Sequence, residues 1–283
     1  MSNEYAALVN DMYVNQRVNL KMDLSMKRDT VLAMFDRVRR EMPGMDRFKR
    51  YTNELALESR ADAEAVDDGS DSARPSESGI HAGAGGSGAG RGGQRWLAIR
   101  KTSVRTGSVN PDSLSEGYKL HRLVLEIAPY FLDVTPLDID HIELLYGFDL
   151  LASGNHDAIV FNALLSGSAL GELVEGGKGG SRVHRTPIDC QPLLGVALAD
   201  GTDIQAHFEV KTRSSIRHGR HVEHREEPIS LYVVVRRHGP FKDVRDLPAV
   251  LRQLVERGED LLDTCIVPKL LLPLREAIAS GHS

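Results

Sequence analysis

Apolar and polar residues alternate with a period of two in several parts of the chain, and this alternation predicts β-strands with one buried face. In residues 17–26 the apolar positions are Val18, Leu20, Met22, Leu24 and Met26. Residues 141–152 and 204–213 alternate in the same way. Asp200-Gly201 precedes the last segment and predicts a hairpin that pairs it with residues 193–199. Residues 229–237 are apolar on both faces, so we expect a central strand there.

Other segments repeat apolar residues every three or four positions, which predicts helices over residues 30–41, 115–132 and 157–165. A longer apolar stripe follows Asp246 and carries Pro248 in its first turn. It predicts a terminal helix. Pro268 and Pro273 should break or kink this helix and leave a second piece that ends near residue 279.

In chain order the elements form two similar runs of strand, helix, strand, strand and helix, with strands also expected over residues 53–59 and 95–105. The first run comprises residues 1–60 and 95–135. The second comprises residues 136–283 and adds one strand before its terminal helix. We therefore predict an α+β fold: a mostly antiparallel sheet with helices on one face, built from pseudo-duplicated β-α-β-β-α units.

Residues 61–94 separate two predicted strands and differ from the rest of the chain. They are acidic at first and glycine-rich afterwards, with few large apolar side chains. Such a segment buries too little surface to offset its ordering entropy. We predict a disordered insertion in a hairpin loop, and a partner-binding or phosphorylated loop is the alternative.

Composition narrows the class of protein. The 283 residues carry a formal net charge of −5, which argues against a globally basic nucleic-acid binder. Cys190 and Cys265 are the two cysteines, too few for a disulfide framework or a four-cysteine zinc site. There is no apolar run of membrane-spanning length and no signal-peptide core in the first thirty residues. We expect a cytoplasmic protein without membrane contact.

A histidine-rich segment is the main candidate for chemistry. Imidazoles bind zinc and, when protonated, phosphate. The candidate metal ligands are His207, His218, His221 and His224. Neighbouring basic side chains are candidate contacts for a partner, an anion or a nucleic acid: Lys211, Arg213, Arg217 and Arg220. The alternative is a solvated hairpin loop without a ligand.

Two aspartate–histidine pairs lie at the two ends of one predicted strand. Asp140 and His141 precede it, and His156 and Asp157 follow it. A strand of about ten residues separates the pairs by roughly 30 Å, so we do not expect them to form one metal site. Asp157 is instead interpreted as a residue that favours the start of a helix.

The familiar catalytic motifs are missing from the sequence. The glycine-rich segment at residues 176–180 lacks the spacing of a phosphate-binding loop, and no Gly-x-Ser-x-Gly element is present. Neither cysteine has a basic neighbour that would activate it, and both are interpreted as core or near-core residues. We therefore predict no catalytic residues, no cofactor and no gathering of reactive side chains.

The leading hypothesis is a non-catalytic protein that binds a macromolecular partner through its sheet face and flexible loops. A protein partner or a second copy of the chain is favoured over nucleic acid. One alternative is a metal- or anion-dependent enzyme or ligand-binding protein that uses the region around His207. A further alternative is nucleic-acid contact through the basic residues from Lys211 to Arg220.

Overall fold

The computed structural model describes residues 4–25, 27–59, 93–175, 185–198, 201, 203–212 and 228–281. Within these ranges the strands form one antiparallel sheet in the order β2-β3-β4-β5-β1-β6-β9-β8-β7. In chain order the strands are β1 (Asp11–Leu20), β2 (Met45–Tyr51), β3 (Glu54–Ser59), β4 (Gln94–Arg100), β5 (Ser103–Val109), β6 (Ile139–Leu150), β7 (Leu193–Ala197), β8 (Ile204–Lys211) and β9 (Ile229–His238).

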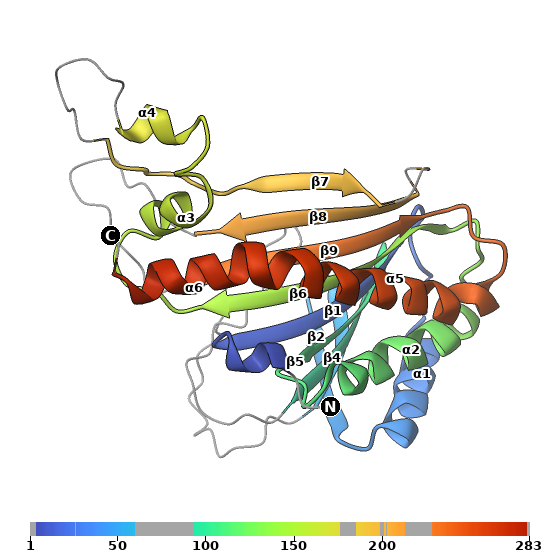
Figure 1. The fold of residues 1–283 in the computed structure, drawn as a ribbon. Coiled ribbons are helices and arrows are strands. Elements are labelled where there is room, and N and C mark those ends of the chain that lie inside the picture. Colours follow the sequence, from blue (N-terminus) through green and yellow to red (C-terminus); the bar gives the residue numbers. More distant parts are fainter. Residues whose placement is uncertain are drawn as a thin grey trace.

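Helices cover one face of this sheet, so the predicted α+β class and the one-sided arrangement are confirmed. Figure 1 shows α5 and α6 running in line across that face, with α2 and α1 beside them. The α-helices are α1 (Arg28–Glu41), α2 (Leu114–Phe131), α3 (His156–Leu164), α4 (Gly171–Glu175), α5 (Leu247–Leu261) and α6 (Leu272–Ala279). Two short 3-10 helices are Glu4–Ala7 and Val244–Asp246.

The main core lies between the sheet and these helices. Each strand directs alternate side chains toward it, as the period of two requires. On β6 these are Ile142, Leu144, Tyr146, Phe148 and Leu150, all buried. β9 lies inside the sheet between β6 and β8 and is buried over its first seven residues, as its two apolar faces predicted. The hairpin of β7 with β8 is also confirmed.

The boundaries of the first strand differ from the expectation. β1 covers Asp11–Leu20, whereas the sequence predicted residues 17–26. Its neighbours β5 and β6 pair with it only as far as Leu20, where the register with β6 shifts. Beyond that point Met22 is 68% exposed. The alternation there does not mark a strand because no neighbouring strand provides hydrogen bonds.

Residues 95–105 were predicted as one strand, and this is wrong. They belong to β4 and β5, which reverse at Lys101-Thr102 and pair antiparallel. This tight turn lacks the glycine and asparagine that normally mark one. β2 was not predicted from the sequence, because its mostly exposed and charged residues show no apolar alternation.

The prolines of the terminal helix do not break it. A π-helical segment, Leu262–Leu271, contains Pro268 and connects α5 directly to α6. Pro273 is the second residue of α6, and the helix continues through it without a break. The wider π turn accommodates the missing N–H of Pro268.

Strands of both sequence runs join in one sheet, with β1 and β6 side by side where the runs meet. The duplication itself remains a prediction. The predicted insertion at residues 61–94 lies outside the described residues, apart from Gly93 and Gln94, of which Gln94 opens β4. Among the described helices, none has the length and apolarity needed to cross a membrane.

Candidate functional site

The face of the sheet that carries no helices bears a row of charged side chains across its central strands. Strand register places Arg105 opposite Arg17, Arg17 opposite Glu143, and Glu143 opposite Arg236. These four residues, on β5, β1, β6 and β9, are called the arginine row. All four occupy strand positions that alternate with core positions, so their side chains share the helix-free face. The row brings three guanidinium groups together with one carboxylate.

Glu143 is the negative centre of the arginine row and is only 4% exposed. Its Oε2 accepts hydrogen bonds from Nε and Nη2 of Arg236 at 3.1 and 2.9 Å. Its Oε1 lies 3.9 Å from Nη1 of Arg17. Burial alone would raise the pKa of Glu143, but a hydrogen bond with His141 and the charges of Arg236 and Arg17 outweigh it and lower that pKa. Glu143 is therefore ionised and mainly neutralises Arg236.

Arg105 and Arg17 are poorly neutralised. Arg105 has no carboxylate within 4.0 Å among the described residues, and its guanidinium carbon lies 5.7 Å from the centre of the Trp96 ring. Burial, followed by the charges of Arg100 and Arg17, lowers the pKa of Arg105 to about 10. Burial also lowers the pKa of Arg17. Both remain cationic at neutral pH, so positive charge is in excess here.

The surroundings of these two arginines add further hydrogen-bonding groups. Arg100 on β4 donates to Oε2 of Glu54 at 2.6 Å. Within the described part of the chain, three buried polar atoms nearby have no hydrogen-bond partner: Asn15 Oδ1, Arg17 Nε and Ser103 Oγ. Register places Ser103 beside Arg100 on one side and Asn19 on the other. Other buried polar atoms without a partner lie elsewhere among the described residues, including Arg95 Nε and Ser108 Oγ, so this feature is not confined to these arginines.

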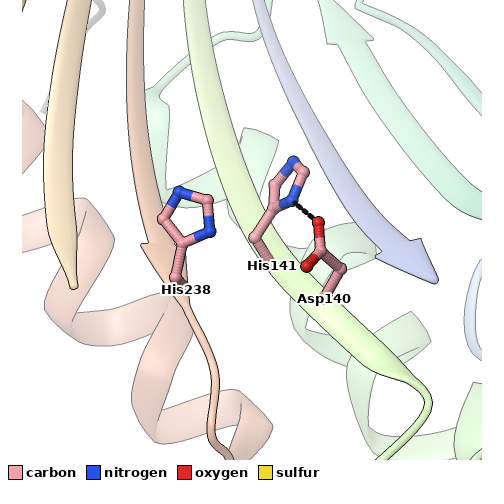
Figure 2. A group of neighbouring side chains, drawn as sticks. All are labelled: Asp140, His141 and His238. Carbon is pink, nitrogen blue, oxygen red and sulfur yellow. Dashed lines mark hydrogen bonds and ion pairs between the residues drawn. The ribbon is translucent and has the colours of Figure 1, made fainter. Parts of the chain in front are cut away.

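One end of the same face holds two imidazoles and a carboxylate: Asp140 and His141 of β6 and His238 of β9, called the histidine group (Figure 2). His141 and His238 are directly opposite in the strand register, and their ring centres are 5.2 Å apart. Nδ1 of His141 lies 2.8 Å from Oδ2 of Asp140. One possible ligand atom from each residue lies within 4.8 Å of the other two.

A β-bulge explains how two consecutive residues of β6 reach the same face. Asn19 pairs with His141 and Leu20 with Ile139, so Asp140 is the extra residue between two paired positions. Such a bulge redirects a side chain that regular alternation would place on the opposite face. The sequence analysis placed Asp140 and His141 before the strand and did not predict that His238 lies near them. Three reactive side chains therefore gather here, which the sequence did not predict, in a group that is only partly buried.

Of the predicted metal ligands, His207 lies on the helix-free face but outside the histidine group. It is half-buried on β8, with Nε2 3.4 Å from Oε1 of Gln205. Burial, followed by the charge of Arg236, lowers its pKa. The remaining candidates, His218, His221 and His224, lie outside the described residues.

Of the predicted basic contacts, Lys211 closes β8, where its Nζ lies 3.2 Å from Oε1 of Glu209. Arg213, Arg217 and Arg220 lie outside the described residues. Lys211 belongs to the opposite end of β8 from Gln205, whose register partner is Arg236. The predicted contact is therefore not part of the arginine row.

The second aspartate–histidine pair stabilises the fold beyond the other end of β6. Asn155 caps α3 by accepting from the N–H of Ala158. Asp157 is 2% exposed and accepts from the N–H of Cys190 and from Oγ1 of Thr212. Burial, with the charges of Asp157 and Asp189, raises the pKa of the Cys190 thiol to about 11. As predicted, this pair is separated from His141 by the length of β6, and Cys190 is a buried residue.

The arrangement on the helix-free face is suited to holding an anion over the arginines and a cation over the histidine group. Arg236 and His238 were missed as site residues because nothing in the sequence indicates that β9 lies next to β6. The detectable signal was the polar end of β9, residues 236–238, after an otherwise apolar strand. Neither the known protein families nor the curated proteins provide a match for this chain.

Proposed function

We propose that the protein is a binding protein that holds a small ligand through a phosphate or carboxylate group placed over Arg17, Arg100 and Arg105. The observation that carries this proposal is the direct pairing of Arg17 with Arg105 on adjacent strands. The one carboxylate contact of these two arginines among the described residues is that of Arg17 with Glu143 at 3.9 Å. Two guanidinium groups that face each other across adjacent strands repel, so without a counter-charge this pairing does not stabilise the sheet.

Electrostatics favours an anion at this position. Like charges that face each other across two strands destabilise a sheet, and half-buried charges lose hydration that only a counter-charge replaces. Two carboxylates, Glu143 and Glu54, are already engaged by Arg236 and Arg100. The excess positive charge on Arg17 and Arg105 therefore attracts an additional negative group.

Hydrogen-bond geometry favours an oxyanion in particular. Guanidinium groups donate paired N–H groups that match the oxygen atoms of phosphate and carboxylate. The side chains of Arg17 and Arg100 are 36% and 35% exposed, so their guanidinium groups can donate to such an oxyanion. The Trp96 ring beside Arg105 adds an aromatic surface on which an attached organic group can pack.

This proposal follows the alternative hypothesis of an anion-dependent ligand-binding protein, and not the leading hypothesis of a macromolecular partner. It places the contact on described residues of the sheet, and not on the loop with Arg217 and Arg220. A macromolecular partner, including a second copy of the chain, and a cytoplasmic location remain predictions. Light scattering in solution measures the self-association directly.

Isothermal titration calorimetry tests the proposed site. Pyrophosphate and citrate are titrated separately into the full chain in a buffer of low ionic strength that has been freed of metal ions with a chelating resin. Binding of pyrophosphate alone identifies phosphate chemistry, and binding of citrate alone identifies carboxylate chemistry. Binding of neither contradicts the proposal.

Variants locate the binding. Arg17→Met and Arg105→Met keep an unbranched apolar stem but remove the charge, and each should weaken binding at least about tenfold, since a charge-assisted hydrogen bond contributes about 1.5–3 kcal/mol. Arg122→Met is the matched control, because Arg122 lies exposed on α2 and loses the same charge. If all three variants bind with the wild-type affinity, the anion does not bind at the arginine row, and Arg217 and Arg220 become the candidate contacts.

A further inference from the structure

We propose that Asp140, His141 and His238 form a binding site for a divalent transition-metal ion. Two strands contribute to it: the bulged start of β6 provides the carboxylate and one imidazole, and the end of β9 provides the second imidazole (Figure 2). The ion is independent of the proposed oxyanion ligand, and either proposal can fail without the other.

The donor set has the chemistry of a transition-metal site. Two imidazole nitrogens and a carboxylate oxygen suit Zn²⁺ or Fe²⁺, whereas Mg²⁺ and Ca²⁺ prefer sites made of oxygen ligands. The three ligand atoms already lie within 4.8 Å of one another, so a shared ion requires only small side-chain movements. Three protein ligands leave at least one coordination position open to water or to another ligand.

The protonation states favour metal binding. A hydrogen bond from His141 lowers the pKa of Asp140, which keeps this carboxylate ionised. Burial, followed by the charges of His141 and Arg236, lowers the pKa of His238 and favours the neutral imidazole that metals bind. Among the described residues, no side-chain partner occupies a ring nitrogen of His238.

The surroundings of His141 can support the bound state. Nδ1 of His141 lies 2.8 Å from Oδ2 of Asp140, and Nε2 lies 2.7 Å from Nδ2 of Asn19. A neutral ring that binds an ion through Nδ1 carries its proton on Nε2. Oε2 of Glu143 lies 3.4 Å from Nε2 and can accept it, while the Asn19 amide turns. Metal-bound histidines commonly have such an outer carboxylate partner.

Zinc titration tests the site. ZnCl₂ is added to the metal-free full chain in a buffer without phosphate, and calorimetry measures the affinity and the stoichiometry. We expect one equivalent of Zn²⁺ to bind and Mg²⁺ not to compete. His238→Ala should weaken binding by more than the roughly 10–100-fold that loss of an outer partner costs. A wild-type chain that binds no Zn²⁺ would overturn the proposal.

Matched histidine variants decide where zinc binds. His207→Ala removes an imidazole from the same sheet face outside the group and should leave the affinity unchanged. A combined His218→Ala, His221→Ala and His224→Ala variant tests the histidine-rich loop. If this variant abolishes binding while His238→Ala retains it, the site lies in the loop and the proposal is wrong.

A further variant and a second readout guard against misfolding. Asp140 is exposed, so Asp140→Asn should unfold at the wild-type temperature and still bind more weakly. With Co²⁺ in place of Zn²⁺, the visible absorption of the bound ion should differ between wild type and Asp140→Asn. Identical spectra and affinities would exclude Asp140 as a ligand. Arg105→Met should leave the zinc affinity unchanged, so failure of the oxyanion proposal is recognised separately.

Discussion

The two faces of the sheet use polar side chains in opposite ways, although both come from alternate positions of the same strands. On the helix-covered face, buried polar side chains such as Thr106, Gln16 and His121 are neutral: Thr106 donates to Gln16 at 3.1 Å and lies 2.7 Å from Nδ1 of His121, while Nε2 of Gln16 and Nε2 of His121 have no partner among the described residues. In the arginine row of the helix-free face the polar side chains are charged, with three guanidinium groups to one carboxylate. Neutral pairs preserve the stability of a core, whereas unbalanced charges reduce it.

This difference is the basis for proposing that the helix-free face binds a ligand. A half-buried Arg105 without a nearby carboxylate lowers stability in the absence of a ligand, and a ligand that supplies the missing charge restores it. Effects on stability should separate the two faces.

Truncation in the helix-covered core should have the largest effect. Leu144 is fully buried on β6, and Leu144→Ala should lower the free energy of unfolding by about 2–5 kcal/mol because it leaves a cavity. Urea denaturation measures this change. Leu151, just beyond the same strand, is 59% exposed, and Leu151→Ala should change stability by less than about 0.5 kcal/mol. Similar losses in both variants would contradict the assigned core.

Removal of the only carboxylate in the arginine row should have the next largest effect. Glu143→Gln leaves Arg17 and Arg236 without their counter-charge. Because these side chains are 36% and 21% exposed, the expected loss is about 1–3 kcal/mol, smaller than for a fully buried pair. Urea denaturation with and without pyrophosphate tests this, and the anion should recover part of the loss. An unchanged free energy of unfolding in Glu143→Gln would show that the stability of the arginine row does not depend on charge balance.

Acid should lower the free energy of unfolding through His121, which is buried on the helix-covered side of the sheet. Burial lowers the pKa of this histidine to about 3 from an ordinary value near 6.5. Between these values the unfolded chain binds a proton that the folded chain excludes. Stability therefore decreases as the pH falls below about 6.5, with a maximal slope of about 1.4 kcal/mol per pH unit.

Comparison with a variant isolates this contribution. His207 and His238 also have lowered pKa values and add to the slope with the same sign. His121→Gln cannot titrate, so its stability should fall less steeply between pH 6.5 and 4.5 than that of the wild type. Parallel curves from urea denaturation would exclude His121 as the source.

Local patterns predicted most of the fold. The class, the one-sided helices and the interior position of β9 followed from periodicity, because buried faces impose it. The β4–β5 turn at Lys101-Thr102 was missed because it lacks turn residues, and β2 because a mostly exposed strand needs no apolar alternation. Pro268 misled the helix prediction because a π turn accommodates it.

The site was harder to predict than the fold because it depends on strand order. Arg17 was visible as a polar position on its strand, but its neighbours Arg105 and Glu143 come from strands far away in sequence. His141 and His238 become opposite partners only when β9 returns beside β6. A one-residue bulge at Asp140 then completes the histidine group, and single-sequence periodicity does not reveal such a bulge.

The most direct test of an oxyanion site is the stability cost of Arg105→Met, measured once without ligand and once with pyrophosphate at ten times its Kd. Packing against Trp96 contributes equally to both measurements and cancels in their difference. At this concentration pyrophosphate stabilises the wild type by about 1.4 kcal/mol and a tenfold weaker variant by about 0.4 kcal/mol, so the cost should be greater with pyrophosphate by about 1 kcal/mol or more. The same cost under both conditions would contradict the assignment of the helix-free face as an anion-binding surface.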